Sequence, residues 1–171
     1  GLIDFSRPAR PQRKRHDLRD TLERALNLVE GRAEKQQVAT EWDLGDQPVI
    51  VDGDPQQLHQ VFVNLLINGI EAMPGGGTLR VALTHNALQK KAVVHVQDTG
   101  EGIPAELMPR LFEPFASAKE RGTGLGLPVS RRILEEHGGA ITARPRSPKG
   151  TIFEVTLPAL ITVEKAVAGY L

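Results

Sequence analysis

The clearest pattern of hydrophobic and polar positions lies in residues 60–73, QVFVNLLINGIEAM. Its apolar residues recur at the spacing of an amphipathic helix. A second, polar stripe crosses this pattern at steps of four, four and three residues, which puts its members on one helix face. The stripe consists of Gln60, Asn64, Asn68 and Glu71. Because asparagine is a poor helix former, two asparagines one turn apart indicate mutual hydrogen bonding, helix capping or a polar ligand along the helix.

Hydrophobic spacing elsewhere predicts two more helices and several strands. The helices are expected at residues 17–37 and 125–137, and Asp54 and Pro55 are typical of the N-cap and first position of the central helix. A short helix is expected at residues 104–110. The expected strands cover residues 38–44, 48–51, 78–85, 92–97, 140–144 and 151–157. Three main helices and about six strands in mixed order, the third and fourth strands forming a hairpin, indicate an α+β fold.

Composition narrows the function classes. The chain has 171 residues, of which 40% are hydrophobic, enough for one domain with a sizeable core. Basic and acidic residues balance at 21 each, so no net charge draws the chain to nucleic acid or an anionic membrane. The absence of cysteine excludes disulfides and cysteine-based zinc sites. No apolar run approaches the roughly 20 residues of a membrane span.

The two ends of the chain carry weaker patterns. Residues 1–6 are a short fragment ended by Arg7 and Pro8, and a basic run overlaps this end. The run consists of Arg7, Arg10, Arg13, Lys14 and Arg15. We expect a solvated linker here rather than a contact with nucleic acid or lipid, because the charge is balanced elsewhere. Residues 159–171 follow Pro158 and are expected to form a loosely held tail.

The segment DTGEGI at residues 98–103 is a candidate ligand-binding segment. Asp98 ends a predicted strand, and its carboxylate can accept a hydrogen bond from an exocyclic amine such as that of adenine, worth about 1.5–3 kcal/mol. Gly100 and Gly102 allow positive φ and the close approach of a ligand. The alternative is that Asp98 only caps the turn that follows it.

A second glycine-rich segment, GTGLGL at residues 122–127, leads into the third helix. Its amides and the helix N-terminus suit phosphate, although a flexible hinge has the same composition. It lacks the Gly-Lys-Ser/Thr ending of a Walker loop, and no strand immediately precedes it. Residues 116–124 predict a mobile loop, in which Lys119 and Arg121 either reach a terminal phosphate or remain solvated. Asn68 offers an amide oxygen, a donor type that Mg²⁺ accepts.

Four segments in fixed order together resemble the catalytic, ATP-binding domain of two-component sensor histidine kinases. NLLINGIEAM resembles the N box, DTGEGI the first Gly box, LFEPF the Phe box and GTGLGL the second Gly box. The similarity extends to VDGDPQQLHQV, HGGAI and GTIFEVTLP, and covers residues 18–158. The sequence Glu71-Ala72-Met73 after the second asparagine is similar to nitrogen-regulation and related kinases.

This resemblance implies the Bergerat fold, an α/β sandwich with a mixed, mostly antiparallel sheet, three main helices on one face and a flexible ATP lid. It implies ATP and Mg²⁺ as cofactors, with Asn68 on the metal, Asn64 on phosphate or metal, and Asp98 on adenine. Thr151 would support Asp98 or a water beside it. The implied catalytic residues are Asn64, Asn68 and Lys119. The implied ATP-binding residues are Asn64, Asn68, Glu71, Asp98, Gly100, Gly102, Ile103, Phe112, Phe115, Lys119, Arg121, Gly122, Thr123, Gly124, Leu125, Gly126, Leu127 and Thr151.

Asn64 separates two activities within the wider superfamily. The gyrase, heat-shock chaperone and mismatch-repair ATPases carry a glutamate at the matching position as general base, and an amide cannot take that proton. The resemblance therefore favours phosphoryl transfer to a protein histidine over hydrolysis. An ATPase switch, a serine kinase and a nucleotide-binding adaptor are the alternatives.

None of the five histidines fits the phospho-acceptor well. His16 lies in HDLRDTL, which is superficially similar to the acceptor motif but lacks its proline, and too few residues separate it from Asn64 for a dimerisation hairpin. The others are expected at surface or core positions: His59, His85, His95 and His137. We expect the acceptor helix to lie outside this chain.

The expected organisation is the end of a dimerisation helix and a linker at residues 1–16, the catalytic domain at 17–158 and a tail at 159–171. The implied partners are the protein's own dimerisation and phospho-acceptor domain, a response regulator receiver domain and a second subunit in the full-length homodimer. The isolated fragment is expected to be monomeric and inactive in autophosphorylation. A cytoplasmic location is expected, with the cytoplasmic part of a membrane-bound sensor as one form of it, and no nucleic-acid partner is expected.

Two departures from the family pattern stand out. Ala116-Ser117-Ala118 replaces the bulkier Phe-Thr-Thr that often precedes the lid lysine, which weakens the expected anchoring of the lid. Gly69 stands where alanine is commoner, and it is expected to loosen the helix by up to about 1 kcal/mol while leaving the asparagine face intact.

Overall fold

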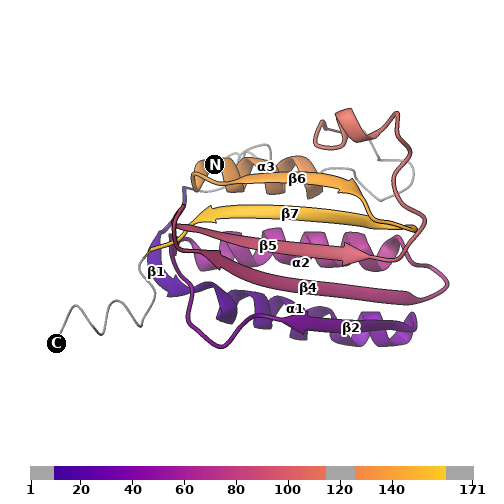
Figure 1. Cartoon of the computed structure of the whole chain (residues 1–171), viewed down its shortest axis with the longest axis horizontal. Helices are drawn as coiled ribbons and strands as arrows, with labels where there is room; N and C mark the ends of the chain where they lie inside the picture. Colours follow the sequence, from indigo (N-terminus) through magenta and orange to yellow (C-terminus); the bar gives the residue numbers. More distant parts are fainter. Residues whose placement is uncertain (1–9, 115–125, 161–171) are drawn as a thin grey trace, which may run out of the picture.

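A five-stranded sheet forms one layer of the molecule, and helices form the other (Figure 1). The computed structural model describes residues 10–114 and 126–160. The sheet strands are β2 (Val38–Asp43), β4 (Gly77–Asn86), β5 (Lys91–Asp98), β6 (Ala140–Pro145) and β7 (Thr151–Pro158). Their order is β2-β4-β5-β7-β6, in which β2 is parallel to β4 and the other neighbours are antiparallel. The predicted hairpin is the β4–β5 pair.

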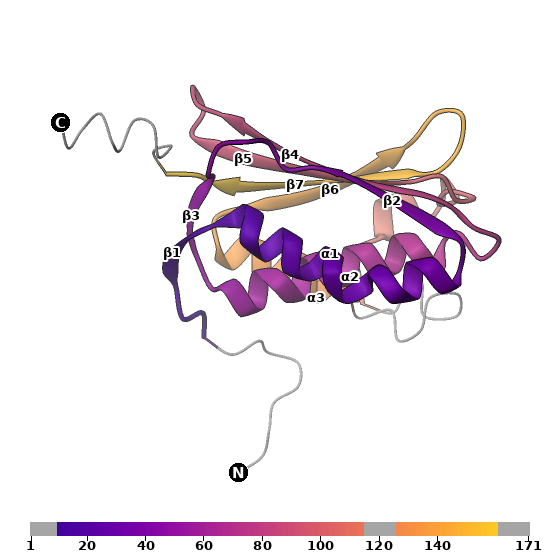
Figure 2. The same cartoon turned by 90° about the horizontal axis from the view of Figure 1, so that it is seen from below.

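All three α-helices of the described residues cover the same face of this sheet (Figure 2). They are α1 (Leu18–Lys35), α2 (Pro55–Glu71) and α3 (Gly126–Glu136). A mixed, mostly antiparallel sheet with three helices on one face confirms the predicted α+β class. The short helix expected at residues 104–110 is reduced to a 3₁₀ turn at Met108–Arg110. Over the part of the chain that the structure describes, no helix is long and apolar enough to cross a membrane.

Side-chain caps determine where the first two helices begin. The Asp17 carboxylate accepts a hydrogen bond from the Arg19 amide at 3.0 Å, and Asp54 accepts from Gln56 and Gln57 at 2.9 and 3.2 Å. Such caps satisfy amides that have no partner within the helix. The predicted N-cap of the central helix is therefore confirmed, with Pro55 at the first helical position.

The core lies between the sheet and the apolar face of α2, the central helix. Six apolar residues of α2 have no exposed surface: Leu58, Val61, Phe62, Leu65, Leu66 and Ile70. Alternate residues of β5 are buried as well, as expected for a sheet covered on one face: Ala92, Val94, Val96 and Asp98. Asp98 thus occupies the last inward position of a strand whose other inward residues are hydrophobic.

A second, two-stranded sheet corrects the expectations for both ends of the domain. β1 (Lys14–Asp17) pairs antiparallel with β3 (Ile50–Gly53), so Lys14 and Arg15 of the basic run lie in a strand and not in a linker, although both are exposed to solvent as expected. The Leu160 amide donates to the Ile50 carbonyl at 2.7 Å, and Ala159 is buried. The prediction of a loosely held tail is therefore wrong for residues 159 and 160. The rest of that segment lies outside the described residues.

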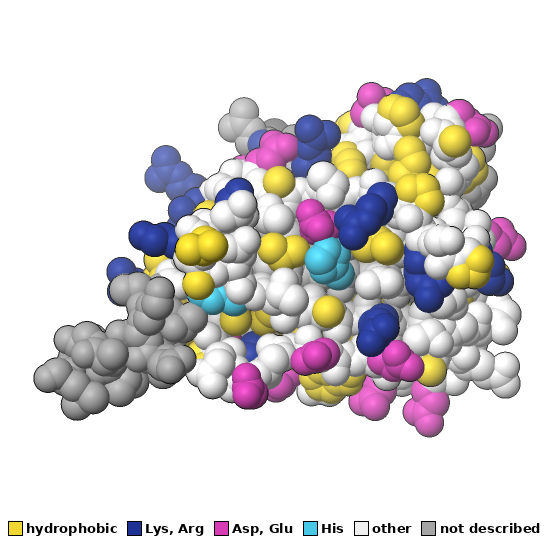
Figure 3. Space-filling model, in the orientation of Figure 1, with side chains coloured by type: hydrophobic (Ala, Val, Ile, Leu, Met, Phe, Trp, Pro, Cys, Tyr) yellow, Lys and Arg dark blue, Asp and Glu magenta, His cyan; other side chains and the backbone are white. Residues whose placement is uncertain are grey.

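The other face of the main sheet is not covered by helices, and it carries polar and charged side chains among apolar ones (Figure 3). His95 Nε2 lies 2.8 Å from the Glu154 carboxylate, and Arg144 lies 3.5 Å from the same oxygen. The hydrogen bond with His95 is the main reason that the pKa of Glu154 lies below its ordinary value. His95 is therefore a half-buried residue of this face, as expected.

Candidate nucleotide-binding site

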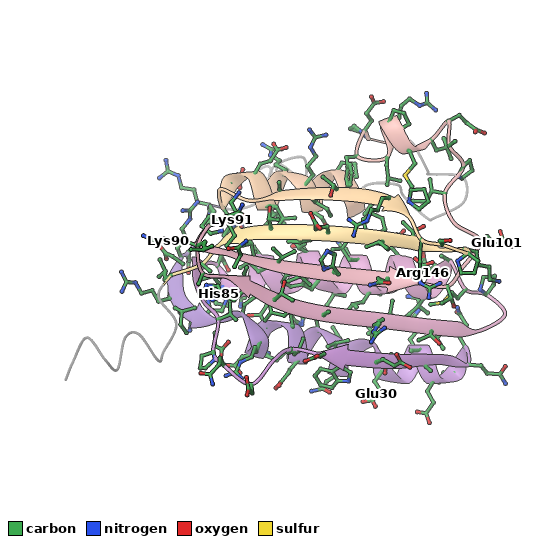
Figure 4. All side chains as sticks on the ribbon, in the orientation of Figure 1. Glu30, His85, Lys90, Lys91, Glu101 and Arg146 are labelled. Atoms are coloured by element: carbon green, nitrogen blue, oxygen red, sulfur yellow. The ribbon has the colours of Figure 1, made fainter. Side chains whose placement is uncertain are left out.

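The predicted site residues gather where β5 ends. Asp98 is the last residue of β5, and it lies opposite Leu79 of β4 and Thr151 of β7 in the strand register. Both Asp98 and Thr151 are buried, at 3% and 2% exposure. Figure 4 shows Glu101 and Arg146 at this end of the sheet, near the turns that follow β5 and precede β7. The structure thus brings Asp98 and Thr151 together, as the resemblance implied.

The central helix passes directly beside the Asp98 side chain. A Cβ at Gly69 of α2 would lie 3.7 Å from Asp98 Cβ, 3.9 Å from Asp98 Oδ2 and only 2.8 Å from Leu79 Cδ1. A side chain at position 69 would therefore have to displace the buried Leu79. Gly69 therefore lets α2 pack closely against this corner of the sheet. This close packing explains why glycine stands here, in addition to the expected loosening of the helix.

One oxygen of Asp98 caps the turn that follows. Oδ1 accepts a hydrogen bond from the Gly100 amide at 2.9 Å, so the capping alternative describes this oxygen correctly. Oδ2 is the oxygen that lies near Gly69 of α2. The carboxylate can therefore fix the turn with one oxygen and present the other towards the helix.

Glycines let the backbone pass closely around Asp98. A Cβ at Gly100 would overlap the Ala72 carbonyl oxygen, and a Cβ at Gly150 would overlap the Asp98 carbonyl oxygen. Gly102 and Gly150 adopt φ of +84° and +111°. The expected positive φ is confirmed at Gly102 only. Gly100 is required by its close approach to α2, and Gly150 is a site-building residue that the sequence reasoning missed.

Asn64 joins the central helix to the helix that follows the second Gly box. Its Nδ2 donates to Ser130 Oγ of α3 at 3.4 Å, and a Cβ at Gly126 would lie 3.8 Å from Asn64 Cγ and Nδ2. Asp54 and Ala72 cap α2, so capping does not explain Asn64. Asn68, one turn further along, is buried at 8% exposure.

The polar stripe on α2 is divided between different neighbours. The Glu71 carboxylate makes an exposed ion pair with Arg32 of α1 at 3.0 Å, and Gln60 is exposed near the other end of the helix. Of the four stripe residues, only the two asparagines are partly or fully buried among other elements.

The Phe box is attached to the core through the buried Leu111 and the half-buried Phe112. The Phe112 ring makes two further contacts. It meets Phe153 of β7 edge to face, with centroids 6.4 Å apart, and the Arg131 guanidinium lies 5.9 Å from its centroid. Ile103 and Leu127 of the predicted site also pack on the core, half-buried and buried respectively. Arg131 is a further residue that the sequence reasoning did not single out.

Part of the predicted site lies outside the described residues. This holds for the predicted mobile loop at 116–124 and for seven predicted site residues: Phe115, Lys119, Arg121, Gly122, Thr123, Gly124 and Leu125. Their contributions stay predictions, as do the ligand contacts of the described site residues.

The opposite end of α2 is held by a buried histidine. The Asp54 amide donates to His137 Nε2 at 3.0 Å, and His137 Nδ1 lies 2.8 Å from the Ile133 carbonyl. With Nε2 accepting, Nδ1 carries the proton and donates to Ile133, so the ring is neutral in this arrangement. His137 is thus a core residue, as expected, and it ties the end of α3 to the start of α2.

The donors near Asp98 and on α2 fit a nucleotide with a hard cation. Among residues 10–114 and 126–160, no three acidic or histidine side chains converge as a metal site. A cation here would be held by amide oxygens together with the phosphate oxygens of its nucleotide, and both are oxygen donors of the kind that Mg²⁺ takes. These features define an α+β domain whose polar site residues gather where α2 packs beside the end of β5, and they indicate the nucleotide-binding class.

Comparison with known proteins identifies this class further. The chain belongs to the family of histidine kinase-, DNA gyrase B- and HSP90-like ATPases, whose family model matches residues 53–161. It is 39% identical to sporulation kinase C of Bacillus subtilis over 158 residues, which cover 92% of this chain and 36% of that protein. It is 31% identical to the sensor histidine kinase ZraS of Salmonella typhimurium over 159 residues, 93% of this chain and 34% of that protein. The chain spans about a third of the length of these relatives.

Solved structures agree with this assignment. The catalytic domain of histidine kinase ThkA superposes with a TM-score of 0.77 at 29% identity, over 86% of this chain and 95% of that one. The mycobacterial sensor histidine kinase MprB gives 0.76 at 28% identity, over 86% and 97%. The Bergerat fold is therefore confirmed, and the chain is an ATP-binding catalytic domain of the sensor histidine kinase type.

Proposed function

We propose that this domain transfers the γ-phosphoryl group of Mg²⁺-bound ATP to a histidine on a dimerisation hairpin outside this chain, in two-component signal transduction. The observation that carries the proposal is Asn64, a neutral amide facing α3 where the hydrolytic members of the superfamily need a general base. Its Nδ2 is bonded to the buried Ser130 hydroxyl. An amide in this position can orient a phosphate or metal but cannot activate water.

Asp98 would recognise the adenine amine with its carboxylate, which the Gly100 amide holds in place by donating to Oδ1 at 2.9 Å. Thr151 would support this contact from the neighbouring strand, where it lies opposite Asp98. Both residues are buried, so a charged hydrogen bond made here is protected from water.

The α2 asparagines would act at the phosphate end of the nucleotide. Asn68 would offer an oxygen to Mg²⁺, which when bound neutralises phosphate charge and helps to orient the transferred group. Gly126 leaves the side of α3 open beside Asn64, and the amides at this helix start suit phosphate. Lys119 and Arg121 would complete the site from the segment outside the described residues.

The proposed partners are the phospho-acceptor hairpin of the same protein, a second subunit, and a receiver domain. The relative ThkA supports the last of these, because it has been solved in complex with response regulator protein TrrA. That kinase superposes on this chain with a TM-score of 0.78 at 27% identity, over 91% of this chain and 44% of that one.

Nucleotide affinity of this domain provides the first test. We expect Asp98→Asn to weaken ATP and ADP binding about 10- to 100-fold, with or without Mg²⁺, since a charged hydrogen bond contributes about 1.5–3 kcal/mol. Asn68→Ala should remove the gain in affinity that Mg²⁺ provides. Asp52→Asn, at an exposed position of β3, is the matched control and should bind as the wild type does. Unchanged titration of Asp98→Asn would show that the adenine assignment is wrong.

Phosphoryl transfer requires the full-length parent protein. We expect labelled Mg²⁺-ATP to place an acid-labile, alkali-stable label on a histidine of the acceptor helix, and Asn68→Ala to abolish it. An acid-stable label on serine would identify a serine kinase. Rapid phosphate release by this domain alone would identify an ATPase switch.

A further inference from the structure

Ser130 is a buried polar residue that is not among the site residues predicted from the sequence motifs. It lies in the second turn of α3, four residues after Gly126, and has no exposed surface. Residues four apart share a helix face, and here Gly126 and Ser130 both face Asn64. The Asn64 amide therefore packs against two consecutive turns of α3.

The contact favours one of the two orientations of the Asn64 amide. Serine hydroxyls inside helices commonly donate to the carbonyl four residues earlier, which leaves their oxygen as an acceptor. Ser130 Oγ accepts from Asn64 Nδ2 at 3.4 Å. When Asn64 Nδ2 faces α3, the oxygen of the same amide points away from α3. An oxygen is the atom that Mg²⁺ or a metal-bound water requires.

We propose that Ser130 is a positioning residue that orients Asn64, so that its amide oxygen rather than its nitrogen faces the phosphate-bound Mg²⁺ or a water on it. This inference rests on the proposed function and extends it to a residue that touches no nucleotide. Without Ser130, the amide can rotate by half a turn and present its two N–H groups. That orientation suits phosphate oxygens but not a cation.

The test is the Mg²⁺-dependent gain in ATP affinity, measured by titrating the domain with ATP in Mg²⁺ and in chelator. We expect Ser130→Ala to reduce this gain about three- to tenfold, while affinity for metal-free ATP stays within about twofold of the wild type. Ser130→Cys, which keeps a weak acceptor of similar size, should give an intermediate gain. Thr21→Val, which removes a buried hydroxyl from α1, is the matched control and should leave the gain unchanged.

A double-mutant cycle separates orientation of Asn64 from a general packing effect. In the Asn64→Ala background, Ser130→Ala should cause no further loss of the Mg²⁺-dependent gain. An equal loss in both backgrounds, or an unchanged gain in Ser130→Ala and Ser130→Cys, would overturn the inference while leaving the proposed function intact. A wild-type domain that gains nothing from Mg²⁺ would overturn both. Thermal unfolding of each variant verifies that affinities are compared between folded proteins.

Discussion

Replacing Asp54 with alanine is expected to destabilise the domain by about 2–4 kcal/mol, because its carboxylate accepts hydrogen bonds from two separate segments of backbone. Oδ1 caps α2 by accepting from Gln56 and Gln57, and Oδ2 accepts from the Gln12 amide at 2.9 Å. Loss of an N-cap costs about 1 kcal/mol. The bond from Gln12 to an ionised group adds about 1.5–3 kcal/mol.

The effect of this substitution should depend on pH. Burial most strongly opposes ionisation of Asp54, but the amides of Gln12, Gln57 and Gln56 outweigh it and hold the pKa of Asp54 below its ordinary value. A lowered carboxyl pKa in the folded state stabilises the protein above the unfolded pKa of about 3.9. That contribution is lost as the pH falls through the lower folded pKa. The difference between wild type and variant should therefore be full at pH 7 and shrink below about pH 4.

Urea unfolding at a series of pH values measures both quantities. Using the difference between wild type and Asp54→Ala at each pH cancels the titration of other carboxylates, such as Asp17 and Glu154, whose pKa values are also lowered. Asp52→Ala, two residues away and exposed, should change the free energy of unfolding by less than about 0.5 kcal/mol. A similarly small change for Asp54→Ala at pH 7, or a difference that stays constant into acid, would refute the reasoning.

Two further substitutions follow from close contacts in the site. Gly150→Ala should destabilise the domain by more than about 3 kcal/mol, because its φ is +111° and its Cβ would overlap the Asp98 carbonyl; Gly75→Ala, which meets nothing within 4 Å, is the control in the same urea unfolding experiment. A double-mutant cycle of Phe112→Leu and Arg131→Ala should give a coupling energy of about 0.5–1 kcal/mol in unfolding experiments, as expected for an exposed cation–π contact. Additive effects would show that the 5.9 Å contact does not contribute.

Local chemistry explains why most of the fold was predictable from the sequence. Helix periodicity and the caps Asp17 and Asp54 place α1 and α2 within a few residues of their observed limits. The strand Lys14–Asp17 was missed because KRHD has neither apolar alternation nor high strand propensity. It forms only because Ile50–Gly53 presents a partner backbone, which is a tertiary effect that no local pattern contains.

The site was predictable in its residues but not in all of its contacts. The turn after β5 follows from the composition of DTGEGI, and the pairing of Asp98 with Thr151 follows from the family resemblance. Gly150 and Ser130 could not be predicted as site residues, because their roles depend on tertiary contacts with Asp98 and Asn64. The spacing of four residues between Gly126 and Ser130 was the available signal, since it places a polar group on the same face of α3 as the glycine.

The two ends of the central helix α2 have different roles: one anchors the helix and the other carries site residues. Its N-terminus is held by Asp54, His137 and the segment that carries Gln12, whereas Asn64 and Asn68 lie further along towards the end of β5. A helix of this length spans about 25 Å, and capping effects fade within its first turn. Loss of the Asp54 contacts should therefore lower stability without altering the Mg²⁺-dependent gain in ATP affinity. Ser130→Ala should instead reduce the Mg²⁺-dependent gain in ATP affinity. The two substitutions therefore distinguish the anchoring of α2 from the orientation of Asn64.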